Sequence, residues 1–282
     1  MRKGLYILLI TALLLVATAG IASAITDGEL DGEGHPHVVL LLMDVGGEPK
    51  YRCSATMLSP TVVLTAGHCT SNYPGDVYTG MRIYTESDVD GGDGITNDYT
   101  NGTCDLGNCI EAASWAAHPD YEDYPWYTND VGVVILEEPF YLDEYGVLPP
   151  YDGYIEGLIL QRKQDVTFTS VGYGLQISFP TAAAWKEQAD RVRMVTNPFL
   201  IQLNAPGMTG DYSLLLSNNP NTGGTCYGDS GGPNFIGSGD AETNIVAGVT
   251  SFGMNPRCKG IGGVFRMDRQ NVLDFVSSFL GE

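Results

Sequence analysis

The chain has 282 residues, of which 43% are hydrophobic, and this length can bury one large domain core or two small ones. Its 34 acidic residues against 14 basic ones give a formal net charge of -20, which disfavours phosphate backbones and anionic membrane surfaces as partners, so nucleic-acid binding is not expected. The 36 glycines, 15 prolines and 16 tyrosines favour many turns and short strands, as in an all-β fold.

The first 24 residues have the organisation of a secretory signal peptide. Arg2 and Lys3 precede an apolar run over residues 5–19, and the small residues Ala22-Ser23-Ala24 follow. Cleavage after Ala24 would make Ile25 the new N-terminus of a secreted protein without a membrane segment. The alternative is an uncleaved membrane anchor, because the run approaches the roughly 18 to 20 residues that span a bilayer. The Ala-x-Ala ending favours cleavage.

Short apolar runs separated by turn residues follow and are typical of strands. A proline-containing, acidic break over residues 137–157 divides them into two groups. We therefore predict two β-units, over residues 25–148 and 149–267. The expected strands are 37–43, 51–58, 61–66, 81–85, 111–117 and 131–136 in the first unit, and 165–172, 192–197, 212–217, 244–252 and 263–266 in the second.

The C-terminal segment over residues 268–282 is predicted to be a helix. Apolar residues at 272, 273, 276, 279 and 280 form a helical stripe, and Asp268 can cap its start. Residues 182–193 are a second candidate for a short helix.

Residues 224–233, Gly-Thr-Cys-Tyr-Gly-Asp-Ser-Gly-Gly-Pro, place Ser230 among glycines that allow backbone amides to approach a reacting atom. This is a setting for a nucleophile. A serine hydroxyl reacts poorly alone, so the hypothesis requires a histidine base, a carboxylate that orients it, and donors for a developing oxyanion.

The positions of the four histidines select among serine chemistries. Residues 228–232 also fit the Gly-x-Ser-x-Gly pattern of α/β-hydrolases, but that fold places its histidine after the serine, and here every histidine precedes Ser230. His68 ends an apolar strand beside Cys69, which can fix the backbone, so it is the preferred base. His118 is interpreted as a surface or turn residue, and His35 and His37 as structural.

Asp130 stands immediately before the apolar strand of residues 131–136, where it can be partly buried and face an imidazole. An aspartate before a strand is usually a turn residue. The order His68, Asp130, Ser230 raises it above that interpretation.

Three motifs now carry a resemblance: Thr-Ala-Gly-His-Cys at 65–69, Asn-Asp-Val at 129–131 and Gly-Asp-Ser-Gly-Gly-Pro at 228–233. With them the chain resembles the trypsin and chymotrypsin family of serine proteases. The resemblance implies two packed six-stranded antiparallel β-barrels with the site between them, and a serine endopeptidase acting through an acyl-enzyme. His68 would be the general base, Asp130 would orient it, Ser230 would attack, and the amides of Gly228 and Ser230 would form the oxyanion hole.

The resemblance also implies an activation step. In the family, a new N-terminal Ile or Val amine pairs with the aspartate before the nucleophile, which here is Asp229. Ile25-Thr-Asp-Gly resembles the family's Ile-Val-Gly-Gly start and directly follows the expected cleavage site. The hypothesis is that signal removal itself frees the activating amine of Ile25.

Six cysteines in an exported chain favour disulfides over a metal site, although six allow fifteen pairings. Cys104 and Cys109 can close a small loop, and two longer loops are plausible. The resemblance matches those longer loops, Cys53 with Cys69 and Cys226 with Cys258, to family disulfides, and does not account for Cys104 with Cys109.

By the same resemblance Gly224 forms the floor of the substrate pocket, where trypsins carry an aspartate. The predicted pocket is open and uncharged, so we expect cleavage after large apolar or aromatic residues, although Glu242 or the net acidity could still attract basic substrates. Residues 251–253 would pair with the substrate backbone. The pocket residues are Gly224, Thr225, Ser251, Phe252, Gly253 and Gly263.

The acidic loop of residues 88–94 invites a calcium interpretation, but it lacks the EF-hand spacing, and a solvated turn is favoured. Asn101 begins a glycosylation sequon.

No metal or cofactor is expected, and the partners are polypeptide substrates of a monomer. The alternative function is a catalytically silent homologue that binds partners through the same cleft. Intact His68, Asp130, Ser230 and Gly228 favour the enzyme.

Overall fold

The computed structural model describes residues 24–89, 104, 109–124, 127–160, 162–176 and 190–281. The signal-peptide prediction up to residue 23 lies outside these residues. So do the acidic loop from Asp90 onwards, the Asn101 sequon and residues 182–189 of the candidate helix over 182–193, whose described residues 190–193 are not helical.

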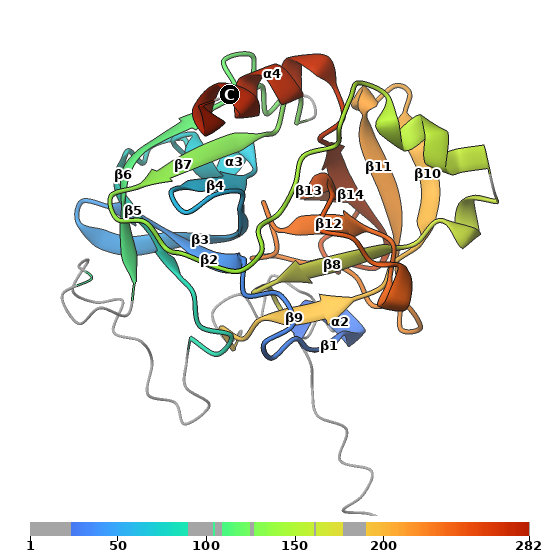
Figure 1. The fold of residues 1–282 in the computed structure, drawn as a ribbon, viewed down its shortest axis with the longest axis horizontal. Coiled ribbons are helices and arrows are strands. Elements are labelled where there is room, and N and C mark those ends of the chain that lie inside the picture. Colours follow the sequence, from blue (N-terminus) through green and yellow to red (C-terminus); the bar gives the residue numbers. More distant parts are fainter. Residues whose placement is uncertain are drawn as a thin grey trace, which may run out of the picture.

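The first group of apolar segments forms a closed antiparallel barrel in the order β2-β3-β4-β7-β6-β5, which fills the left half of Figure 1. Alternating or continuous burial along these strands puts their valines, leucines and methionines into the barrel core. The strands are β2 (Val38–Val45), β3 (Glu48–Met57), β4 (Val62–Thr65), β5 (Tyr78–Tyr84), β6 (Ile110–Ala117) and β7 (Gly132–Leu136).

The second group forms an eight-stranded antiparallel sheet in the order β1-β9-β8-β12-β13-β14-β11-β10, on the right of Figure 1. The all-β prediction with two β-units and a C-terminal helix is confirmed, with an open half-barrel in the second unit where a closed six-stranded one was expected. The strands are β1 (Glu29–Leu30), β8 (Phe168–Gly172), β9 (Met194–Thr196), β10 (Leu200–Ala205), β11 (Gly210–Asn218), β12 (Pro233–Ile236), β13 (Val246–Gly253) and β14 (Gly260–Arg266).

Three of these strands were not predicted from the sequence. β1 has only two residues, β10 pairs with β11 through two register shifts, and β12 begins with a proline. Short length, bulges and a leading proline each weaken the alternating pattern on which strand prediction depends.

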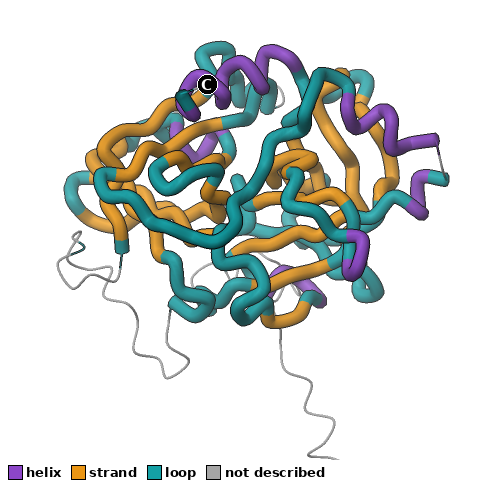
Figure 2. Tube along the Cα trace, in the orientation of Figure 1, coloured by secondary structure: helices purple, strands orange, loops and turns teal. Residues whose placement is uncertain are grey.

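The proline-containing break joins the two units. Residues 137–153 run as a loop between β7 and the 3-10 helix η2 (Tyr154–Leu160), in teal in Figure 2. Gly146 donates its amide to the Met57 carbonyl of the first barrel, and Val147 donates to Asn244 beside the second sheet. The loop is therefore hydrogen-bonded to both β-units.

The remaining helices are short apart from the last. They are α2 (Ala24–Asp27), α3 (Gly67–Thr70), η3 (Lys163–Asp165), η5 (Gly239–Ala241) and α4 (Gln270–Leu280). Helix α4 follows β14 of the second sheet but packs on the first barrel, near β4 and β7, through buried Val272, Leu273 and Val276 (Figure 1). Within the described ranges, no helix combines the length and apolarity needed to cross a membrane.

A buried ionic network ties the N-terminal segment to the second sheet. His35 makes hydrogen bonds to Asp31 through Nδ1 and, at 2.5 Å, to Glu242 through Nε2, and Arg193 donates from Nε to Asp31 at 2.7 Å. The His35 ring stacks on Phe235 with 5.7 Å between ring centroids. Burial alone would lower the pKa of His35, but the hydrogen bonds and charges of Asp31 and Glu242 outweigh it and raise the pKa to about 9.

This network predicts a pH-dependent stability. Because the pKa of His35 rises from 6.5 to about 9 on folding, its stabilising contribution is complete below pH 6.5 and is lost as the pH rises through 9. We expect the free energy of unfolding to fall by about 3 kcal/mol over that window, as the size of such a shift implies. Urea unfolding at several pH values measures it. His35→Gln should flatten this part of the profile, and an unchanged profile in that variant would contradict the assignment.

Candidate active site

The pairing of β4 with β7 brings the predicted base and its carboxylate together. Thr65 ends β4 opposite Gly132 of β7, so His68 in α3 and Asp130 before β7 leave the same end of the ladder. His68 Nδ1 lies 3.0 Å from Asp130 Oδ2, and the His68 amide donates to Asp130 Oδ1 at 2.9 Å. A carboxylate only accepts, so Nδ1 carries the proton and Nε2 of the neutral ring is left as the base.

Asp130 is fully buried and has a further donor that the sequence did not indicate. The Ser251 hydroxyl donates to Asp130 Oδ2 at 2.5 Å. Burial alone would lower the pKa of His68, yet the charge of Asp130 and its hydrogen bond raise it above the ordinary value of 6.5. The His68 side chain keeps 20% of its surface exposed, so it can exchange protons with a bound molecule.

Close packing of Gly231 against Thr65 brings Ser230 to the same end of β4. A Cβ on Gly231 would lie 1.9 Å from Thr65 Oγ1, at the end of β4, and the φ of Gly231 is +78°. Only glycine allows this approach. Ser230 and His68 both line one cavity of about 760 Å³, and the Ser230 hydroxyl makes no hydrogen bond to any other described residue.

The amides around Ser230 divide into two sets. Those of Cys226, Asp229, Gly231 and Gly232 all donate hydrogen bonds within the protein. Those of Gly228 and Ser230 have no acceptor in the described part of the chain. Gly228 also has a φ of +96°, and a Cβ there would approach the Gly174 Cα at 3.0 Å. The geometry therefore leaves two donors of one turn available for an anionic oxygen.

Two disulfides brace this site. Cys53 bonds to Cys69, the neighbour of His68, and Cys226 bonds to Cys258 in the loop between β13 and β14. A third disulfide joins Cys104 to Cys109. All three occur where the sequence analysis considered them.

Asp229 is fully buried beside Ser230. It accepts the amides of Gly174 and Cys226, each at 2.8 Å. Burial raises the pKa of Asp229 to about 7, against the lowering effects of those amides and of Arg52. Ile25 is also fully buried, against Met194, but its nitrogen is here a peptide amide, and no hydrogen bond joins it to Asp229 in the described chain.

The sequence profile of the trypsin family matches residues 29–275. The chain belongs to the trypsin family. The similar proteins include a trypsin of Saccharopolyspora erythraea, 26% identical over 83% of this chain and 88% of that one. Brachyurin of Leptuca pugilator is 26% identical over 79% and 84% of the two chains.

The fold comparison agrees. A solved structure of HL collagenase superposes with a TM-score of 0.63 and 19% identity, over 92% of this chain and 99% of that one. The family predicted from the three motifs is thus confirmed for this trypsin-family chain.

The residues expected at the pocket fall into two sets. Thr225, Ser251, Phe252 and Gly253 line the cavity that holds His68 and Ser230, and Gly224 and Gly263 do not. A Cβ on Gly263 would meet the Phe252 ring at 2.3 Å, so this glycine makes room for the Phe252 side chain. Gly262 is the neighbour whose Cβ would point at Thr225, 3.3 Å from Oγ1.

Three further residues lie in surroundings that were not expected from the sequence. The Tyr127 ring lies against His68 with 5.2 Å between centroids and lines the cavity. Glu242 is paired with His35 and does not reach the cavity. His118 is buried against Phe275 of α4 and is no surface residue, because α4 covers this part of the barrel.

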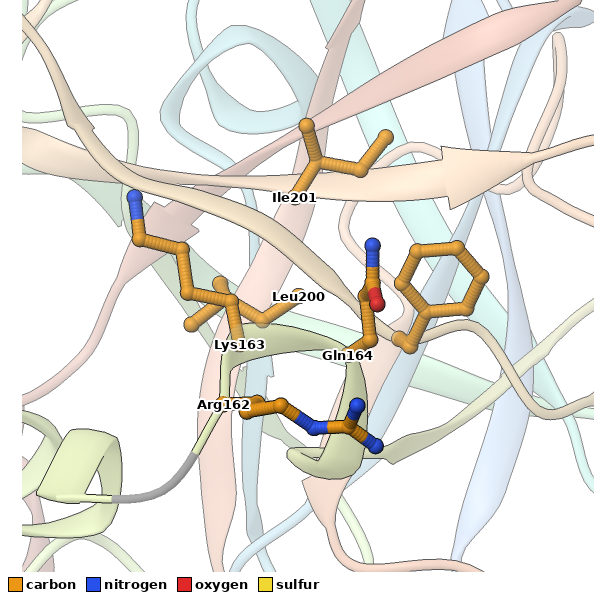
Figure 3. A pocket seen from close by; sticks show the side chains of 6 residues that line it. Arg162, Lys163, Gln164, Leu200 and Ile201 are labelled. Carbon is orange, nitrogen blue, oxygen red and sulfur yellow. The ribbon is translucent and has the colours of Figure 1, made fainter.

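A smaller cavity of about 330 Å³ lies between η3 and β10 (Figure 3). Arg162, Lys163 and Gln164 line it from η3 and its N-cap, with Phe199, Leu200 and Ile201 opposite. It contains none of the predicted site residues. In this trypsin-family chain, His68 and Ser230 line the larger cavity of about 760 Å³.

Proposed function

We propose that this trypsin-family chain is a secreted serine endopeptidase that hydrolyses peptide bonds through an acyl-enzyme. The observation that carries the proposal is that His68, paired with Asp130, and Ser230, whose hydroxyl bonds to no other described residue, line one cavity of about 760 Å³. The amides of Gly228 and Ser230, in one turn, have no acceptor in the described part of the chain.

In the proposed mechanism, Nε2 of His68 takes the proton of Ser230 as Oγ attacks the scissile carbonyl carbon. The imidazolium is stabilised by the buried Asp130 carboxylate, and the developing oxyanion accepts the amides of Gly228 and Ser230. His68 then gives the proton to the leaving amine, which departs and leaves the acyl group on Ser230. Water, deprotonated by His68, then attacks the ester carbon. The bond from Ser230 Oγ to the acyl carbon breaks, His68 returns the proton to Oγ, and the acid product leaves.

We further propose that removal of residues 1–24 frees the Ile25 amine for Asp229. Ile25 and Asp229 are both fully buried, and the carboxyl of Asp229 is held with a pKa of about 7 while Ile25 remains acylated. A buried carboxylate gains most from a cationic partner, so a free amine here would lower that pKa and favour the ionised form. Export is supported by the signal-like leader and three disulfides.

For the substrate we propose large apolar or aromatic side chains before the scissile bond. Among its described lining residues are Thr225, Phe252 and Met254, and the single acid among them is Asp123. The protein is proposed to act as a monomer, with an N-terminal unit over 25–148 and a C-terminal unit over 149–267.

The function is tested on exported protein. The full chain is expressed with its leader, the N-terminus of the product is sequenced, and the product is treated with a fluorophosphonate and with Phe, Leu and Arg peptides. We expect a start at Ile25, stoichiometric labelling, and cleavage of the Phe and Leu peptides.

Two outcomes would contradict parts of this proposal. No labelling of folded protein that starts at Ile25 would favour the silent binding homologue. Fully active protein with another N-terminus would overturn the role of Ile25, and a tenfold preference for the Arg peptide would overturn the substrate class.

A further inference from the structure

Asn218 occupies the space into which a side chain at position 224 would project. A Cβ on Gly224 would lie 2.1 Å from the Asn218 Cγ and 2.3 Å from its Oδ1. No rotamer of a residue at 224 relieves a clash at Cβ, since Cβ is fixed by the backbone. The floor of this region is therefore filled by a side chain from the end of β11 instead of one from the loop before Ser230.

The Asn218 amide is fixed on both sides. Its Nδ2 donates to the Thr225 carbonyl at 2.8 Å, and its Oδ1 accepts the Thr26 hydroxyl at 3.2 Å. Asn218 and Thr26 are each only 1% exposed. Both ends of the amide are thus satisfied by the protein, and the group carries no charge.

The amide lies next to the cavity wall. A Cβ on Gly262 would be 3.3 Å from Thr225 Oγ1 and 4.0 Å from Asn218 Nδ2. Thr225 itself lines the cavity that holds Ser230. Asn218 therefore lies directly behind Thr225, which a side chain bound in the cavity would meet.

From these contacts we infer that Asn218 is a specificity-determining residue, which supplies the uncharged floor of the substrate pocket in place of a side chain at 224. The inference rests on the proposed peptidase function. A neutral amide with both polar atoms engaged offers a Lys or Arg side chain no counter-charge, and desolvating a cation without one is costly. The floor thus excludes basic side chains and admits apolar ones.

Hydrogen bonds from Thr26 give Asn218 a second role, in positioning Thr225. Gly224 donates its amide to the Thr26 carbonyl at 3.1 Å, and the Thr26 hydroxyl touches Asn218 and the Gly224 carbonyl. The position of Thr26, the residue after Ile25, therefore orients the Asn218 side-chain amide. That amide in turn holds the Thr225 carbonyl.

The test is Asn218→Asp, which keeps the shape of the side chain and adds a charge at the floor. The wild type and the variant are titrated with a fluorophosphonate, so that rates refer to reactive Ser230, and kcat and KM are measured on matched Arg and Phe peptides. We expect the ratio of kcat/KM for Arg over Phe to rise at least tenfold, mainly through KM of the Arg peptide. The matched control is Asn221→Asp, which adds the same charge at an exposed position and should leave the ratio within twofold.

A second variant keeps the inference falsifiable if Asn218→Asp does not fold. Gly224→Asp alone should lose titratable sites, because its Cβ would lie 2.1 Å from the Asn218 Cγ and 2.6 Å from the Asn218 Cβ. Gly224→Asp combined with Asn218→Gly, which removes that Cβ as well, should regain them and prefer the Arg peptide. A titratable Asn218→Asp with an unchanged ratio overturns the inference, and so does a functional Gly224→Asp single variant. Loss of titratable sites in both Asn218→Asp and the double variant also counts against it. Absence of labelling in the wild type is a separate result, which refutes the proposed function.

Discussion

Ser230→Ala is expected to lower kcat for peptide hydrolysis by about 10⁶-fold and to abolish fluorophosphonate labelling, as removal of a triad nucleophile does. The other serine among the described residues that line the cavity, Ser251, cannot replace it in the same orientation, because its hydroxyl donates to Asp130. Residual hydrolysis of about 10³ over water should remain from binding and the two free amides. The measurement is single-turnover kinetics on the best peptide of the profile.

The variant should be folded, because the Ser230 hydroxyl makes no hydrogen bond to another described residue and its loss costs the fold little. The matched control is Ser278→Ala on the exposed face of α4, which should keep wild-type kcat and labelling. Labelling that persists in Ser230→Ala would place the nucleophile elsewhere.

The sequence was informative where chemistry and chain order constrain each other. Every histidine precedes Ser230, which removed the α/β-hydrolase alternative, and the strand ends beside His68 and Asp130 were readable as apolar runs. The pairing of β4 with β7 then converts two positions far apart in the sequence into a 3.0 Å contact.

The sequence was less informative where one side chain takes over the space of another. Gly224 was expected to form the pocket floor, yet Asn218 fills the place of its side chain from a strand of a different part of the sheet. Gly263 was expected at the wall, but a one-residue difference in the pairing of β13 with β14 turns it toward Phe252. Such exchanges depend on strand register, which the alternating pattern of apolar residues does not fix in glycine-rich segments such as 260–263.

Polar partners of buried groups were also missed. The Ser251 hydroxyl on Asp130 and the Glu242 carboxylate on His35 each join residues over a hundred positions apart. Burial makes both contacts necessary, since an unpaired buried polar group is costly, but nothing local in the sequence identifies the partner. These contacts were accessible only from the folded chain.

Asp130→Asn is expected to lower kcat by about 10⁴-fold while leaving the protein folded, as the loss of a triad carboxylate does. The asparagine can turn its amide group toward Nδ1 of His68, which then accepts, so the ring proton moves to Nε2. In that tautomer Nε2 has no lone pair for the Ser230 proton. Kinetic measurement on peptide and on an activated ester separates this loss of base catalysis from a loss of binding, because KM should change little.

The pH profile gives an independent reading of the same change. With Asp130 present, the pKa of His68 is raised above 6.5, so the activity of the wild type should rise through an apparent pKa above that value. Without the carboxylate, burial is left as the main influence on the pKa of His68, and the residual activity should rise at lower pH.

Ser251→Ala is the matched control. It removes one donor from Asp130 but keeps the charge, so it should retain the raised pKa and cost about tenfold in kcat or less, the scale of one hydrogen bond. A profile of Asp130→Asn that coincides with the wild type, or a loss below tenfold, would refute the role of this carboxylate, since neither the tautomer nor the charge would then matter to the base.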